Sequence, residues 1–190
     1  MPDTDAHPTY LLVDGENIDA TLGMSVLGRR PDPTERPRWD RILHFTEEVW
    51  QRAARGLFFL NATSGQMPMS FVQALLAMNF HPIPLAGSTT EKVVDIGIQR
   101  TMDAILAQGT GDVILASHDG DYIPQVEKLL DDGRRVGVLC FREFLNSELA
   151  GLTERGLQIY DLEDDLGAFN AVLPRVRIIP LESFDPTRYL

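Results

Sequence analysis

The chain has 190 residues, 44% of them hydrophobic, which predicts one globular domain with its own core rather than two. Its 28 acidic and 17 basic residues give a formal net charge of −11, and such a surface counts against a protein that coats nucleic acid. An enzyme that holds cations among its acids is not excluded, because a bound metal changes the local sign of the charge.

Predicted strands and helices alternate along the chain. Residues 9–13 (TYLLV) form a short apolar strand that ends at Asp14, a helical stretch covers 16–27, and residues 28–38, with three prolines and four arginines, predict a long loop. The apolar spacing then predicts helices over 39–54, 70–80, 90–108, 122–133 and 144–152, and strands over 57–61, 82–86, 112–117, 135–141 and 157–162.

Local signals mark several element ends. Ser70 and Thr90 are the expected N-caps of their helices, and Gly133 ends the helix that begins at residue 122. The prolines of residues 82–86 place that strand near a sheet edge.

The predicted strands are continuous apolar runs with short connections to helices, which indicates a parallel sheet covered on both faces. We therefore expect an α/β fold, a three-layer α/β/α domain over residues 8–162 with a mostly parallel central sheet. Residues 163–190 form a C-terminal extension that adds an edge strand or an arm. The acidic run of residues 161–165 is expected to be solvated surface.

The single cysteine, Cys140, lies in the apolar run VGVLCF and makes a disulfide within the chain impossible. A buried structural thiol is expected, which fits a reducing, cytoplasmic compartment. The start of the chain shows no signal-peptide pattern, and no apolar run approaches the length that spans a bilayer. We therefore expect a cytoplasmic protein without a membrane partner.

Acidic residues follow two of the predicted strands. Asp14 ends the first strand, and Ser117, Asp119 and Asp121 follow the strand over 112–117. If these strands are neighbours where the strand order reverses, three carboxylates meet in one crevice. Carboxylates that close repel one another, and Mg²⁺ or Mn²⁺, which prefer oxygen ligands, are the natural neutralisers.

The helix over 90–108 can add a fourth acid. Asp95 lies in its first two turns, after Lys92, and can face the same crevice. Asp103 lies eight residues further on, roughly 12 Å along the helix axis and rotated by about 80°, so it fits the same metal shell only weakly and is expected on a solvated helix face. Asn17 could bind a metal-bound water or a phosphate oxygen, and Ser117 could orient a carboxylate.

Acids gathered at strand ends with a divalent metal suit phosphodiester hydrolysis, in which no covalent nucleophile is required. The motifs DGEN (14–17), KVVD (92–95) and SHDGDY (117–122), followed by GRRVGVLC, resemble the NYN family of PIN-like ribonucleases, whose related bacterial members are called LabA-like. The likeness covers roughly residues 9 to 160, in the expected order.

The resemblance implies a PIN-like sheet and a metal-dependent endoribonuclease that uses Mg²⁺ or Mn²⁺ to cut RNA. By motif, the metal-binding and catalytic acids are Asp14, Asp95, Asp119 and Asp121, and the supporting residues are Asn17, Ser117 and Lys92. His118 stands where the family commonly has glycine, and Tyr122 where it has phenylalanine. Thr101 stands where a further acid is common, and the connection over residues 23–41 is longer than usual.

The long loop carries Arg29, Arg30, Arg36 and Arg38, which could grip RNA phosphates. The alternative is a solvated loop, because acids are interleaved with these arginines. A homodimer is a further possibility, with the proline-rich tail as one means of pairing.

Two other functions compete with the ribonuclease. Thr101 motivates a catalytically inactive NYN-fold module that binds RNA or a protein partner. A phosphohydrolase of the haloacid dehalogenase kind would use Asp14 as a covalent nucleophile, but it usually needs an aspartate where this chain has Glu16.

Overall fold

The computed structural model describes residues 7–190 and contains a six-stranded sheet in which all neighbouring strands are parallel. The strand order is β3-β2-β1-β4-β5-β6. The strands are β1 (Thr9–Asp14), β2 (Ala54–Asn61), β3 (Phe80–Leu85), β4 (Asp112–Ala116), β5 (Val136–Cys140) and β6 (Gln158–Asp161). The prediction that 82–86 lies at a sheet edge is confirmed, because β3 is the terminal strand.

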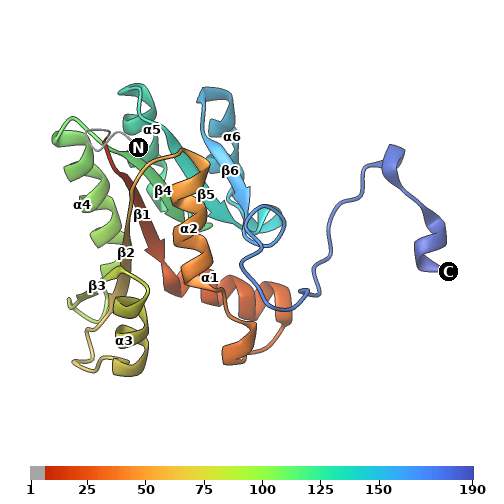
Figure 1. The fold of residues 1–190 in the computed structure, drawn as a ribbon, viewed down its shortest axis with the longest axis horizontal. Coiled ribbons are helices and arrows are strands. Elements are labelled where there is room, and N and C mark those ends of the chain that lie inside the picture. Colours follow the sequence, from red (N-terminus) through yellow and green to blue (C-terminus); the bar gives the residue numbers. More distant parts are fainter. Residues whose placement is uncertain (1–6) are drawn as a thin grey trace.

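Helices lie on both faces of the sheet, as Figure 1 shows. They are α1 (Gly15–Ala20), α2 (Trp39–Val49), α3 (Met69–Ala77), α4 (Val93–Ala107), α5 (Ile123–Asp131) and α6 (Ser147–Gly151). A wider helical turn continues α1 to Leu27. The predicted α/β fold with a parallel central sheet is confirmed. In the part of the chain that the structure describes, none of the helices has the length and apolar character needed to cross a membrane.

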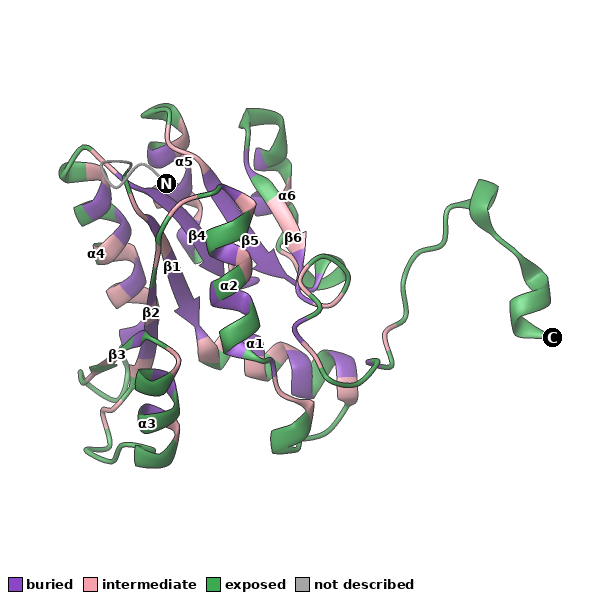
Figure 2. Cartoon of the chain, in the orientation of Figure 1, coloured by how far each residue is buried: buried purple, intermediate pink, exposed green. Residues whose placement is uncertain are grey.

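The alternation of side chains along β1 divides the core into two halves. Leu11 and Val13 pack under α1 and α2 together with Trp39, whereas Leu12 packs on the opposite face against Ile98 of α4. Because both faces are covered, the central strands are buried along their length (Figure 2). Burial on both faces explains why these strands are continuous apolar runs in the sequence.

Two predicted helix ends are wrong. The helix predicted over 39–54 ends at Val49, because Gln51 adopts a positive φ of 53° and the chain turns directly into β2 at Ala54. The helix predicted over 70–80 ends at Ala77, and Phe80 already belongs to β3. In both places the apolar pattern runs on from a helix into a buried strand, so its period does not mark the boundary.

Both predicted N-caps are also wrong. Pro68 precedes α3, so Ser70 lies inside the first turn of that helix. The N-cap of α4 is Lys92 rather than Thr90. Residues 88–91 form a separate turn, in which the carboxylate of Glu91 accepts the backbone N–H of Ser88 at 2.7 Å, and this turn delays the helix.

Residues 163–190 add no strand to the sheet, so of the two expectations for this segment, an edge strand or an arm, the edge strand is not formed. The first part of this segment returns to the domain, where Ala168 and Leu173 are buried in the core on the α2 side. The last part leaves the body and runs outward (Figure 1).

Candidate active site

The strand order reverses between β1 and β4, since β2 and β3 continue from β1 on one side and β5 and β6 continue from β4 on the other. Val13 of β1 pairs with Ala116 of β4 across this junction. The carboxyl ends of the two strands therefore open together, at the place where open parallel sheets bind ligands. The expectation that these strands are neighbours is confirmed.

Asp14 lies at the end of β1 and is 2% exposed. Its Oδ1 accepts the backbone N–H of Asn17 at 3.3 Å, and its Oδ2 accepts the hydroxyls of Ser117 at 3.1 Å and Tyr122 at 2.9 Å. Burial raises the pKa of Asp14 from 3.8 to about 6, and these hydrogen bonds offset the rise only in part. The carboxyl group can therefore bind or release a proton near neutral pH.

The hydroxyl of Tyr122 lies between two acids, 2.9 Å from Oδ2 of Asp14 and 3.1 Å from Oδ1 of Asp95. The ring is fully buried, and burial together with the two carboxylates raises the pKa of the phenol far above its usual range. The protonated hydroxyl thus couples Asp14 to Asp95. Sequence reasoning noted Tyr122 only as a replacement for phenylalanine, although a hydroxyl on a buried ring signals a polar partner.

Three of the predicted acids form a tight group. One carboxylate oxygen each of Asp95, Asp119 and Asp121 lies within 4.8 Å of the other two. Burial raises the pKa of Asp95, and repulsion from Asp119 and Asp121 adds to the rise. This set of hard oxygen donors has the chemistry that Mg²⁺ and Mn²⁺ prefer, so these residues fit a divalent cation.

Two polar side chains hold Asp121 on the solvent side of the group. Lys92 Nζ lies 2.9 Å from Oδ2 of Asp121 and 3.7 Å from Oδ2 of Asp95. Gln99 Nε2 donates to the backbone carbonyl of Asp121 at 2.9 Å. The hydrogen bond to Asp121 and the nearby carboxylates raise the pKa of Lys92, which keeps a positive charge beside the acids.

Asp103 is not part of the acidic group, because its carboxylate pairs with Lys128 of α5 at 3.6 Å and is half exposed. Thr101 Oγ1 donates to the carbonyl of Gly97, one turn back in its own helix, at 2.8 Å. Neither residue supplies the further acid that is common in the family.

Ser117, Asn17 and His118 bind the two strand ends together. Ser117 Oγ, besides donating to Asp14, accepts the N–H of Asp119 at 3.2 Å. Asn17 Oδ1 accepts the backbone N–H of His118 at 2.8 Å and lies 2.9 Å from His118 Nδ1. Because this oxygen serves His118, it holds the loop after β4 rather than facing the acidic group.

His118 lies in the loop after β4, but the ring is buried, with 6% of the residue exposed. Its Nε2 accepts the backbone N–H of Phe141 at 2.8 Å, so the proton of the neutral ring lies on Nδ1 and points to Asn17. Burial lowers the pKa of His118 from 6.5 to about 4, so the ring is neutral at physiological pH. The histidine fixes the backbone immediately before Asp119.

Gly15 and Gly120 lie beside the acids at this edge of the sheet, and other side chains approach both of them closely. A Cβ on Gly15 would lie 2.6 Å from the ring of Phe58, and a Cβ on Gly120 would lie 2.7 Å from Nδ2 of Asn146. Both glycines adjoin a predicted metal ligand, and a larger residue at either position would force the ring of Phe58 or the side chain of Asn146, or the backbone itself, to shift.

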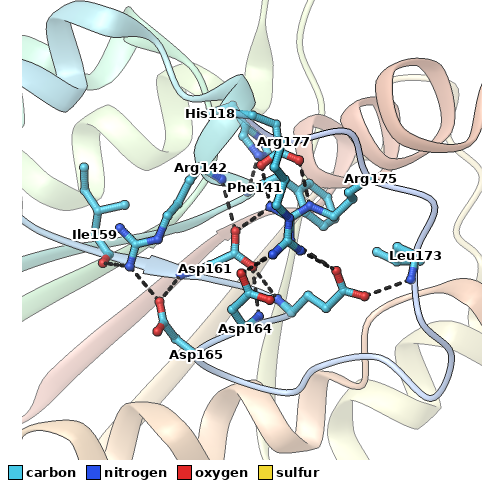
Figure 3. Close-up of polar contacts among 12 residues, drawn as sticks. His118, Phe141, Arg142, Ile159, Asp161, Asp164, Asp165, Leu173, Arg175 and Arg177 are labelled. Atoms are coloured by element: carbon cyan, nitrogen blue, oxygen red, sulfur yellow. Dashed lines mark hydrogen bonds and ion pairs between the residues drawn. The ribbon is translucent and has the colours of Figure 1, made fainter. Parts of the chain in front are cut away.

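A buried cluster of ion pairs, which we call the clasp, joins β6 to the C-terminal segment (Figure 3). Arg175, with a side chain 2% exposed, binds Asp161 through both guanidinium Nη atoms at 2.7 and 2.6 Å. It also contacts Glu143 at 2.5 Å and Glu163 at 3.2 Å. Asp161 is fully buried, so the prediction that the acidic run 161–165 is all solvated surface is wrong.

The clasp touches the candidate site through Phe141. The guanidinium of Arg175 lies 5.0 Å from the centre of the Phe141 ring, and that ring stacks on His118 with centroids 5.7 Å apart. A path of direct contacts therefore runs from the C-terminal segment to the loop that carries Asp119.

The four arginines of the loop over residues 28–38 do not line the acidic site. They lie at the mouth of a separate, mainly apolar cavity or on the exposed surface. Arg29 pairs with Glu35 at 2.6 Å, Arg36 with Asp19 at 2.8 Å and Arg38 with Asp40 at 3.3 Å, and Arg30 is exposed. Their role in RNA binding stays a prediction.

The loop borders a mainly apolar cavity of about 540 Å³ between α1, α3 and the start of α2. Its lining includes Gly15, Trp39, Phe58, Phe71 and Met78. Gly15, which directly follows Asp14, lines this cavity and adjoins the acidic site.

The chain was compared with known families and proteins. A family profile described as NYN domain matches residues 8–153, about three quarters of the chain. The match includes every residue of the acidic group and Asp14. The comparison with curated proteins gives no match.

Proposed function

The chain belongs to the NYN domain family, and from this premise we propose that it is a metal-dependent nuclease that cuts RNA internally. The observation that carries the proposal is the group of Asp95, Asp119 and Asp121, whose carboxylate oxygens lie within 4.8 Å of one another. Three carboxylates at this spacing repel one another, and Lys92 offsets only part of that charge. Burial is the main cause of the raised pKa of Asp95, and repulsion from Asp119 and Asp121 adds to it.

We assign the metal to Asp95, Asp119 and Asp121, with Mg²⁺ or Mn²⁺ as the cofactor. When bound there, a divalent cation lowers the pKa of an attacking water and stabilises charge on the phosphate. The chain's own residues orient the ligands: Asp119 is fixed by Ser117, which binds its N–H, and by its own contact with the N–H of Asp121 at 3.0 Å.

Asp14 has a different role in this proposal, because its carboxylate is buried and both oxygens are already hydrogen-bonded. It holds Ser117 and Tyr122 in place, and its pKa of about 6 allows it to take up a proton close to the reacting groups. Burial argues against a covalent phosphoryl intermediate on Asp14, because a carboxylate that is 2% exposed is not accessible to a phosphate.

RNA is the substrate that the family suggests. Lys92, which is exposed beside the acids, is placed to contact a phosphate, and Arg30 and Arg38 are exposed on the loop before α2. A cytoplasmic location is also part of the proposal, supported by a buried, unpaired thiol at Cys140.

A second candidate is a module that binds RNA or a partner without cutting. Thr101 favours it, because this side chain bonds to its own helix in place of a further acid near the metal group. Both functions use the same fold, and they differ in whether the bound RNA is cut.

The deciding experiment incubates the full chain with circular and linear RNA, each with Mn²⁺, Mg²⁺ or chelator. Cutting of the circular RNA with metal, and none with chelator, is expected. Asp119→Asn should abolish cutting, whereas the matched control Asp103→Asn, on the Lys128 side of α4, should cut as the wild type does. Equal cutting by wild type and Asp119→Asn would overturn the proposal. Absence of cutting together with absence of manganese binding at millimolar metal would favour the module instead.

A further inference from the structure

The loop that carries Asp119 is held by residues far along the chain. The ring nitrogen Nε2 of His118 accepts the backbone N–H of Phe141 at 2.8 Å, and the carbonyl of His118 accepts the N–H of Asn146 at 3.2 Å. The side chain of Asn146 also lies against Gly120, where a Cβ would approach its Nδ2 to 2.7 Å. The backbone on either side of Asp119 is therefore tied to residues that follow β5.

The ring of Phe141 connects this loop to the C-terminal part of the chain. It stacks on the ring of His118, with centroids 5.7 Å apart and planes inclined by 12°. The ring of Phe169 stacks on Phe141 at the same centroid distance of 5.7 Å. The guanidinium of Arg175 lies 5.0 Å from the centre of the Phe141 ring (Figure 3). Because rings and cations at these distances attract one another, Phe169 and Arg175 help to set where the Phe141 ring lies against His118.

Phe169 and Arg175 belong to residues 162–175, which we call the brace. The brace is built into the body, and Leu162 at its start is fully buried in the core on the α2 side. The family profile matches residues 8–153, so the whole brace lies beyond it. All the acids of the candidate site are inside the match, but some of the contacts that hold their loop come from outside.

The charges of the clasp point to a geometric task for the brace. The side chain of Arg175 is 2% exposed and is shared by Asp161, Glu143 and Glu163. Buried ion pairs stabilise a fold little more than apolar side chains of similar volume, and their best-attested use is to select one arrangement. Apolar side chains alone would cover the core, whereas the buried arginine also fixes where the brace meets Phe141.

We propose that the brace is a positioning element of the acidic site. It holds Phe141 against His118, and His118 in turn holds the backbone of Asp119 beside the other two acids. The inference rests on the proposed function, because it gives the brace a part in the same metal site. A ligand that is held in place in advance loses less freedom when it binds a cation. Loosening the brace should therefore weaken metal binding although no ligand is removed.

The first readout needs no metal. Amide hydrogen exchange, followed by NMR on the full chain in chelator, measures how often the loop opens at Asp119 and Asp121, whose N–H groups are both hydrogen-bonded within it. Phe169→Ala and His118→Ala should each speed this exchange at least about fivefold, because the loop loses contacts that oppose local opening. Phe71→Ala is the matched control, since Phe71 is also a half-buried ring packed on the same core but lies on α3. It should change the exchange by less than about twofold.

The second readout is manganese affinity, measured by calorimetric titration. Phe169→Ala and His118→Ala should each weaken binding roughly tenfold, the lower end of the effect of removing a group that orients a metal ligand. Phe71→Ala should bind manganese as the wild type does. In the double variant, Phe169→Ala should weaken binding by less than about twofold beyond His118→Ala, because residues that act along one path are not additive. A general loss of stability would not produce this coupling.

Unchanged exchange at Asp119 in Phe169→Ala would overturn the proposal. Effects of Phe169→Ala and His118→Ala on manganese affinity that simply add, or an equal loss of affinity in Phe71→Ala, would overturn it as well. Failure of the wild type to bind manganese would count against the proposed function instead. The amide exchange would still decide in that case whether the brace holds the loop.

Discussion

The hydroxyl of Tyr122 is bonded to the carboxylate of Asp14, 2.9 Å away and 108 residues earlier in the chain. The same hydroxyl reaches Asp95 at 3.1 Å, so a single phenolic hydrogen is shared between two acids. This arrangement connects the buried end of β1 to the exposed acidic group on α4 and the loop after β4. Tyr122 is therefore a positioning residue for the proposed metal ligand Asp95.

Replacing Tyr122 with phenylalanine should weaken manganese binding roughly tenfold, the lower end of the effect of removing a group that orients a metal ligand. Without metal, the free energy of unfolding should fall by about 1–3 kcal/mol, because two partly or fully buried carboxylates lose a donor. Calorimetric titration and urea denaturation measure the two effects. Tyr10→Phe, which removes the hydroxyl that Gln108 contacts at 3.1 Å, is the control and should leave manganese affinity unchanged.

Asp14 and Asp119 could be singled out from sequence because one ends a continuous apolar strand and the other comes soon after the end of another. Carboxyl ends of parallel strands share one edge of a sheet, but alternation of strands and helices does not fix the strand order, so the adjacency of β1 and β4 had to be assumed. The metal roles of these residues stay predictions. Asp103 shows the converse, because helical spacing alone already separated it from Asp95.

The supporting contacts could not be predicted, since their partners are far apart in the chain. His118 bonds to Asn17, 101 residues away, and to Phe141, and neither contact leaves a local pattern. The clasp was missed for the same reason: Arg175 and Glu143 lie 32 residues apart, and the acidic run before it looks like any solvated segment. Burial of these polar groups is decided by tertiary packing, which periodicity does not report.

Asp14→Asn should make the stability of the metal-free protein less dependent on pH while abolishing the proposed activity. The folded-state pKa of Asp14 is raised from 3.8 to about 6, so the folded state binds the proton more tightly than the unfolded state. Stability linked to this group therefore falls as pH rises from about 4 to 6 and is constant above that range. Asparagine does not ionise, so the variant escapes this pH-dependent loss, which is about 1–3 kcal/mol between acid pH and pH 7. It also loses one acceptor, because its Nδ2 cannot accept from the donors around Asp14, but this cost does not change with pH.

The measurement is urea denaturation of wild type and Asp14→Asn in chelator between pH 4 and pH 8. Stability should shift in favour of Asp14→Asn as pH rises to about 6, and the difference between the two proteins should be constant above that pH. A difference that does not change with pH would contradict the raised pKa.

His118 contributes to stability with the opposite dependence on pH. Its pKa is lowered from 6.5 to about 4, so its stability contribution is lost as pH falls through this range. Asp14→Asn should unmask that slope.

Lys92→Met should strengthen manganese binding by up to about fivefold, because an exposed ion pair is worth at most about 1 kcal/mol and here its cation competes with the metal for Asp121. Calorimetric titration checks this effect. Lys128→Met breaks an exposed pair of the same type with Asp103, away from the acidic group, and is the matched control. Weaker manganese binding by Lys92→Met would show that Lys92 supports the acids instead of competing for them.

Arg175→Met should lower the free energy of unfolding by about 3–5 kcal/mol, because it leaves the fully buried carboxylate of Asp161 without its cation. Although burial opposes ionisation, the hydrogen bonds from Arg175 hold the pKa of Asp161 well below its usual range, so the unpaired charge is costly. Urea denaturation at pH 7 measures the loss.

Arg177→Met is the control. It breaks partly exposed pairs with Glu163 and Asp164 and should lower the free energy of unfolding by no more than about 1 kcal/mol. Adding Asp161→Asn to Arg175→Met should recover part of the lost free energy of unfolding, because it removes the unpaired buried charge. Equal losses in the single and the double variant would show that the packing of Arg175 on Phe141, rather than its charge, holds the C-terminal segment.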